Sequence, residues 1–132
     1  MKPFCLVFIL LACCAGCATT TPVATADKPP RYASRVQVAR YDATERSVRP
    51  EFAVYADAAS VPRPYRIIAL VSHNANPEDQ ALMMQAIAWR ARQLGADGMI
   101  VLPPISGGWH ADGFGTKSKE PVFSAHAIIF TP

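Results

Sequence analysis

Residues 65–102 read YRIIALVSHNANPEDQALMMQAIAWRARQLGADGMIVL and decide the fold of this chain. The part from Ile67 to Val71 is apolar at successive positions, which is typical of a strand covered on both faces. A second apolar run, at residues 99–102, closes the stretch. The segment between the two runs is amphipathic, so the stretch predicts a strand, a helix and a second strand.

Helix signals stand at both ends of the amphipathic segment. Asn76 suits the N-cap, and Pro77 suits the first helical position. Gly95 ends the helix, where we expect the left-handed conformation that glycine adopts at little cost. The predicted buried face consists of Met83, Ile87, Ala91 and Leu94. The strand, helix and strand form a βαβ unit, whose right-handed crossover leaves the two strands parallel.

Further segments extend this unit into one small domain. Short strands are predicted at residues 36–38 and 52–55, and a last strand at residues 122–130. Residues 42–50 are polar and end in proline, so a loop is expected there. Residues 34–132 are therefore predicted to form a single α+β domain, with a small sheet of four to five strands and one long helix packed on it.

The N-terminus has the layout of a secretory signal. Lys2 precedes an apolar run from Phe4 to Cys14, and two small residues stand directly before Cys17. A membrane-spanning helix needs about 20 apolar residues, and this run is shorter. Residues 1–16 are therefore interpreted as a signal peptide that is removed.

The last four residues of this segment, Cys14-Ala15-Gly16-Cys17, resemble the lipobox of bacterial lipoproteins. The resemblance implies a diacylglyceryl group on the Cys17 thiol, cleavage before Cys17 and acylation of the new amine. Cys13, which also follows an apolar run, is the alternative attachment site. With Ala18 directly after the cysteine, the resemblance also implies passage to the outer membrane, with the protein on its periplasmic side. A membrane lipid, held through acylated Cys17, is thus the first expected partner.

All four cysteines lie at or before position 17, so the mature domain can form no internal disulfide and must be held by its apolar core. Residues 17–33 join the lipidated cysteine to the domain and are rich in threonine, alanine and proline. Such a segment cannot offset its ordering entropy by burial, so we expect a disordered tether.

The charge of the mature chain is nearly balanced. After cleavage twelve basic and ten acidic residues remain, which does not indicate a nucleic-acid partner. Arginine dominates the N-terminal half, and we interpret these residues as a solvated face. Contact with anionic lipid head groups or with lipopolysaccharide phosphate is the alternative.

The end of the helix and the following turn, Leu94-Gly95-Ala96-Asp97-Gly98, resemble a recurring element of small uncharacterised bacterial envelope lipoproteins. More distantly, residues 62–130 are similar to the outer-membrane sensor lipoprotein of the Rcs envelope-stress phosphorelay. The resemblance implies a structural turn, in which Gly95 caps the helix and Asp97 ties the turn by accepting backbone N–H bonds. That sensor is stapled by disulfides, which this mature chain cannot form, so a sensing role is an analogy.

A long glycine-rich segment, residues 103–121, separates the last two predicted strands, and residues 104–120 are the expected contact site. Trp109 and Phe114 in this segment either fold back onto the core or stand out as recognition anchors. Trp89 on the flank of the helix raises the same question. If the three aromatic side chains share one exposed patch, an unidentified envelope protein is the expected partner.

His73, His110 and His126 are the candidates for an alternative function, a metal-binding or hydrolytic periplasmic protein. The chain has no CxxC, HExxH or EF-hand spacing and no G-x-S-x-G elbow. Its glycine pairs do not follow a strand into a helix, as a phosphate cradle requires. We therefore expect no catalytic residue and no cofactor, and predict a non-enzymatic binding or sensing module of the envelope.

Overall fold

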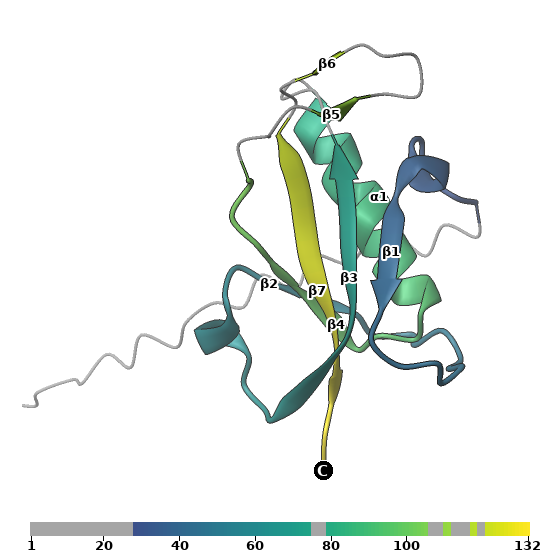
Figure 1. The fold of residues 1–132 in the computed structure, drawn as a ribbon. Coiled ribbons are helices and arrows are strands. Elements are labelled where there is room, and N and C mark those ends of the chain that lie inside the picture. Colours follow the sequence, from purple (N-terminus) through teal and green to yellow (C-terminus); the bar gives the residue numbers. More distant parts are fainter. Residues whose placement is uncertain (1–27, 75–78, 106–109, 112–116, 119–120) are drawn as a thin grey trace, which may run out of the picture.

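The computed structural model describes residues 28–74, 79–105, 110–111, 117–118 and 121–132. One five-stranded sheet carries one long helix on one face, as Figure 1 shows, so the predicted α+β class is confirmed. The elements in chain order are η1 (Ala33–Arg35), β1 (Gln37–Arg40), β2 (Ala53–Tyr55), η2 (Ala58–Ser60), β3 (Tyr65–Asn74), α1 (Gln80–Gln93), β4 (Gly98–Val101), β5 (His110–Ala111), β6 (Lys117–Ser118) and β7 (Val122–Phe130).

The strand order in the main sheet is β1-β3-β7-β4-β2. The last strand, β7, pairs antiparallel with both β3 and β4, so these two strands run parallel, as the βαβ pattern predicts. They are not neighbours, because β7 is inserted between them. This position suits β7, whose residues are buried or half-buried along its whole length and which therefore needs cover on both sides. A separate pair, β5 and β6, is antiparallel.

The strands β1 and β2 form the two opposite edges of the sheet although they follow each other in the chain. β1 is antiparallel to β3, whereas β2 is parallel to β4. Residues 41–52, which we name the crossing segment, run from one edge to the other at the lower end of the sheet in Figure 1. The predicted loop at 42–50 is therefore the connection that spans the sheet.

The main core lies between α1 and the sheet. Small side chains on both layers let the helix approach the strands closely, and the large side chains fill the space between them. Among the largest fully buried side chains are Ile87 on the helix and Val71 on β3, and full burial of each contributes about 1.5–3 kcal/mol. The buried helix residues are Met83, Ala86, Ile87, Ala88 and Ala91. This face agrees with the predicted one, with Leu94 half-buried at its end.

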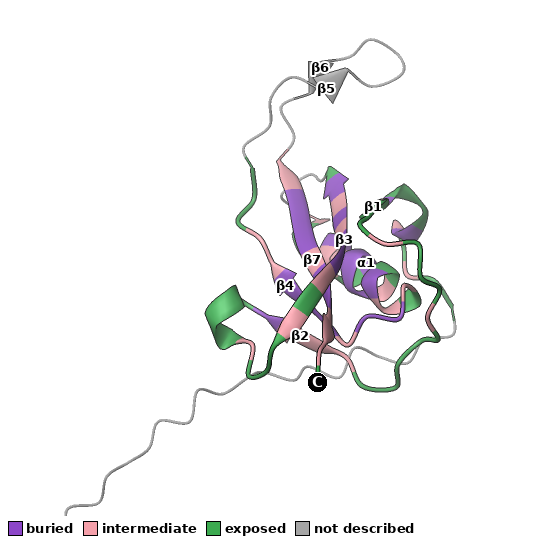
Figure 2. Ribbon diagram, turned by 60° about the horizontal axis from the view of Figure 1, so that its bottom comes forward, coloured by how far each residue is buried: buried purple, intermediate pink, exposed green. Residues whose placement is uncertain are grey.

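The opposite face of the sheet carries a smaller apolar cluster around Tyr55, Ile100 and Ile128. Val61 packs against this cluster from the segment that leads from β2 to β3. Figure 2 shows buried residues along β7 and β4, with exposed residues concentrated in the connections. The sheet is therefore enclosed on the helix side and covered in part on the other.

The folded domain begins earlier than the predicted boundary at residue 34. Tyr32 packs against the main core, and Ala33 in η1 is buried. At the start of α1, the predicted capping residues Asn76 and Pro77 lie outside the described residues. Asp79, directly before α1, makes no capping bond with its side chain. Its Oδ2 instead accepts a hydrogen bond from the Tyr32 hydroxyl at 3.0 Å, which joins the N-terminal part of the domain to the helix.

Gly98 is required by the pairing of β2 with β4. A Cβ at this position would lie 2.7 Å from the carbonyl oxygen of Ala53 and 3.1 Å from Cε2 of Tyr55. We expect Gly98→Ala to lower the free energy of unfolding by about 1–3 kcal/mol, because β2 must shift away from β4. Urea-induced unfolding followed by circular dichroism measures the change. Ala39→Ser on the exposed side of β1 is the control, and an equal midpoint for both variants would contradict the assigned contact.

Candidate functional site

The turn between α1 and β4 is built around Gly95. Its φ of 74° is the left-handed conformation predicted for the helix cap. A Cβ at Gly95 would overlap the Cβ of Arg46 and would lie 2.9 Å from the carbonyl oxygen of Ser47. Glycine is therefore needed here for two reasons, the backbone conformation and the close approach of the crossing segment. The sequence indicates only the first of them.

Asp97 connects three parts of the fold from this turn. Its Oδ2 accepts the backbone N–H of Phe130 at 2.9 Å, and its Oδ1 lies 3.5 Å from Nε of Arg49. Its backbone N–H donates to Ile128, and its carbonyl oxygen accepts from Ala53. The prediction that Asp97 accepts a backbone N–H is confirmed, but the expectation that the donor belongs to the turn is wrong. The donor lies at the end of β7 rather than in the turn, because the turn is short enough to bring the carboxylate beside that strand.

The crossing segment is held by ion pairs that the sequence analysis missed. Arg46 donates to both carboxylate oxygens of Asp42, at 2.8 and 2.9 Å, and Arg66 on β3 lies 3.1 Å from the same carboxylate. Arg92 on α1 donates to the carbonyl oxygens of Arg49 and Pro50. Asp42 and Arg46 are four residues apart, a spacing that brings side chains together on a helix, but residues 41–52 are not helical, so the spacing alone does not predict this pair. The part played by Arg66 has no local signal, because it comes from another strand.

These contacts shift the ionisation of both partners. The hydrogen bond from Arg46 is the main cause that lowers the pKa of Asp42, with the charges of Arg46 and Arg66 acting in the same direction. The same hydrogen bond raises the pKa of Arg46. The pKa of Asp57 is also lowered, because its carboxylate accepts from the hydroxyl and the backbone N–H of Ser60. Each of these carboxylates therefore stabilises local structure in its charged form.

The other end of the sheet carries a cluster around Tyr32. The Cζ atoms of Arg31 and Arg35 lie 5.0 and 5.7 Å from the centroid of the Tyr32 ring. His73, at the end of β3, meets the same ring edge-on at a centroid distance of 6.3 Å. Tyr32 is in the left-handed region, with φ of 73°, which is uncommon for a residue that is not glycine.

The three histidines do not form one site. His73 pairs in register with Phe123, and His126 pairs with Leu70, so the two histidines stand three positions apart along the strands. Alternate positions of a strand face opposite sides, and His73 therefore points to the helix side and His126 to the other. The predicted alternative, an ion held jointly by His73, His110 and His126, is wrong for this physical reason. Within the described ranges, no three His, Cys, Asp or Glu side chains come together as a metal site.

The predicted aromatic contact residues are only partly placed. Trp109 and Phe114 lie outside the described residues, as does Cys17, and their roles stay predictions. Trp89 on α1 is half-buried, and its indole Nε1 is enclosed without a hydrogen-bond partner in the described part of the chain. Trp89 is therefore not a fully exposed anchor. A large exposed apolar side chain, Ile105, stands at the start of the long segment between β4 and β7.

Comparisons of the chain with protein-family models, with curated proteins and with solved structures found no match. Among the described residues, no helix combines the length and the apolar character that a membrane crossing requires.

The hydrogen bond between Asp97 and Phe130 generates a test of the turn. We expect Asp97→Ala to lower the free energy of unfolding by about 1.5–3 kcal/mol, the usual contribution of a hydrogen bond to a charged group. Asp97→Asn keeps an oxygen acceptor and should cost clearly less. Urea unfolding and hydrogen exchange at the Phe130 amide measure both effects. If asparagine costs as much as alanine and Arg49→Ala reproduces the loss, the ion pair and not the hydrogen bond holds the turn.

The lowered pKa of Asp42 predicts acid sensitivity of the crossing segment. A carboxylate whose pKa is lower in the folded state stabilises the fold above its unfolded value, near 3.9, and this contribution is lost as the pH falls through the folded value. We therefore expect stability to fall below about pH 4 and Asp42→Asn to flatten that fall. Unfolding by urea between about pH 2 and pH 6 measures the slope. Asp57→Asn is the comparison, since the Asp57 carboxylate makes separate hydrogen bonds to Ser60. If the native and Asp42→Asn chains lose stability equally steeply as the pH falls, the role of Asp42 is refuted.

Proposed function

We propose that this chain is a lipid-anchored bacterial envelope protein, a non-enzymatic binding or sensing module that faces the periplasm from the outer membrane. The observation that carries the proposal is the sequence Cys14-Ala15-Gly16-Cys17 at the end of a short apolar leader. A triacylated cysteine supplies more than the two lipid chains that stable anchoring requires. The rest of the chain then needs no membrane-seeking segment of its own.

The packing of the domain supports a fold that is stable without disulfide bonds. Val71, Ile87 and Ile128 are completely buried, and the turn at Gly95 ties the sheet to the crossing segment through side-chain and backbone contacts. The described part of the chain begins at Lys28, eleven residues after Cys17. A flexible tether of that length reaches about 17–20 Å on average, which would keep the domain near the membrane surface.

The placement of polar groups supports binding over hydrolysis. Asp42 and Asp97 are committed to ion pairs and hydrogen bonds that hold the crossing segment and the last strand. His73 and His126 lie on opposite faces of the sheet. The contact partner is proposed to be another envelope protein, reached through residues 104–120, with Trp109 and Phe114 as its anchors.

The anchor is tested by replacing the proposed attachment site. In a bacterial host, Cys17→Ala should abolish incorporation of radiolabelled palmitate and leave residues 1–16 in place, because the thiol that accepts the lipid is gone. Intact mass spectrometry of the purified protein measures both effects. Cys13→Ala is the matched control and should be labelled and cleaved as the native chain is.

Two results would contradict the proposal at different levels. Loss of label in Cys13→Ala with normal label in Cys17→Ala would move the attachment site to Cys13. An unmodified and uncleaved native chain that stays in the soluble fraction would refute the lipid anchor altogether.

A further inference from the structure

Arg31 and Arg35 lie over the Tyr32 ring where the described part of the chain begins, and together with Lys28, which is also exposed and stands three residues before Arg31, we name them the basic patch. Residues 28–41 contain four basic residues and no acidic one. The patch therefore lies in the most uniformly positive stretch of the domain, directly after the proposed tether.

The arginines of the basic patch differ from those at the other end of the sheet in what they bind. Arg46 and Arg66 share the carboxylate of Asp42, and Arg49 pairs with Asp97. Within the described residues, Arg31 and Arg35 have no carboxylate partner, and each guanidinium group lies over the Tyr32 ring. Their N–H groups are therefore available to an anion from outside the chain.

The Tyr32 ring, on which these two guanidinium groups lie, is held in place by its own contacts. Tyr32 packs against the main core, and its hydroxyl donates to Asp79 at 3.0 Å. The left-handed backbone of Tyr32 is strained, so it persists because the surrounding contacts determine it. A guanidinium held over an aromatic ring loses less freedom when it binds, and its planar fork matches two oxygens of a phosphate group.

We propose that the basic patch binds the phosphate groups of anionic phospholipids in the membrane that carries the anchor. The phosphate chemistry follows from the patch itself, whereas the identity of the membrane rests on the function proposed above. Even fully extended, the eleven residues from Cys17 to Lys28 span at most about 36–40 Å, so the patch stays close to the bilayer. Headgroup contact would orient the domain, with η1 and the start of α1 towards the membrane and the lower end of Figure 1 away from it.

The test uses the mature chain from position 17 onward with Cys17→Ser, so that no lipid contributes to binding, after its cooperative thermal unfolding has been verified. Sedimentation with vesicles of phosphatidylcholine, with and without about one third phosphatidylglycerol, measures the partition coefficient. Each basic residue near an anionic surface strengthens binding about fivefold, so Arg31→Ala with Arg35→Ala should weaken binding to the anionic vesicles about 25-fold. Raising the salt concentration should weaken binding of the native chain, because the attraction is screened.

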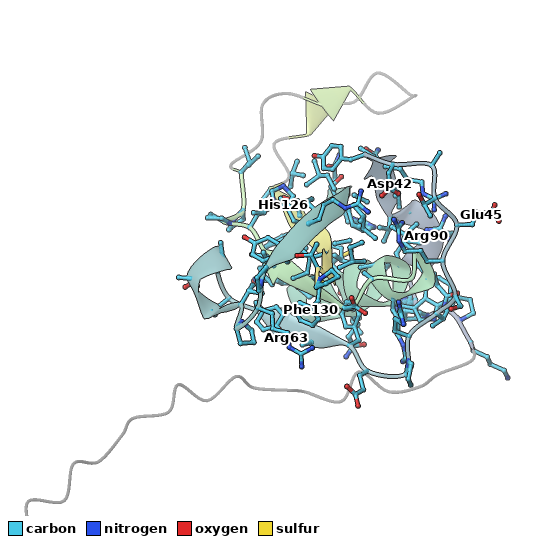
Figure 3. All side chains as sticks on the ribbon, turned by 90° about the horizontal axis from the view of Figure 1, so that it is seen from below. Asp42, Glu45, Arg63, Arg90, His126 and Phe130 are labelled. Atoms are coloured by element: carbon cyan, nitrogen blue, oxygen red, sulfur yellow. The ribbon has the colours of Figure 1, made fainter. Side chains whose placement is uncertain are left out.

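The matched control is Arg63→Ala with Arg90→Ala, which removes the same charge from the opposite end of the domain. Both residues are exposed, and Arg63 also stacks on an aromatic ring, that of Phe130, at 5.1 Å. Figure 3 shows Arg63 beside Phe130 in the view from below, with Arg90 on the helix. This variant should bind anionic vesicles within about threefold of the native chain, because these residues would face away from the membrane. Arg31→Lys with Arg35→Lys should recover most of the affinity, since the charge is kept.

Equal losses in the two double alanine variants would overturn the proposal, because binding would then follow net charge alone. Equal binding of the native chain to both kinds of vesicle would overturn it as well. Neither result bears on the anchor, which intact mass and palmitate labelling test separately. Conversely, a chain without lipid on Cys17 could still show the headgroup preference of the basic patch.

Discussion

The close approach of the crossing segment to the turn between α1 and β4 is the contact on which the rest of the structure depends. Gly95 and Gly98 leave room for the backbone of residues 46–47 and for β2, respectively, and no larger residue fits at either position without displacing them. Because the crossing segment passes this turn, β1 and β2, which are consecutive in the chain, can form the two opposite edges of the sheet. Asp97 adds the hydrogen bond that brings the end of β7 to the same point.

Two groups of charged residues lie at opposite ends of this sheet. At the lower end of the sheet, arginines and aspartates pair with each other, and the hydrogen bond from Arg46 lowers the pKa of Asp42 in the crossing segment. At the other end, Arg31 and Arg35 rest on an aromatic ring that the helix and the core hold in place. A nearly neutral chain thus carries a locally positive surface beside its proposed tether. Net charge alone conceals this separation, because the structural pairs balance one another.

Part of the site could be predicted from local sequence, and part could not. The left-handed cap at Gly95 follows from a glycine after an amphipathic helix, and its position was correctly predicted. The histidines were grouped by residue type, and the strand register separates His73 from His126 because side chains alternate between faces. Tyr32 was assigned to a tether, since a proline-rich segment with few apolar residues gives no sign of a partner. Its partner, Asp79, lies 47 residues away along the chain.

The sequence by itself determined the class of the fold, the helix and its buried face, and the parallel course of the strands on either side of it. These features follow from hydrophobic periodicity and from glycine at a turn, which act over short distances along the chain. Tertiary structure alone decided that β7 separates β3 and β4, that the crossing segment packs on Gly95, and that Asp97 binds Phe130. Such contacts join residues far apart in sequence, and the burial and hydrogen bonding of the whole domain select them.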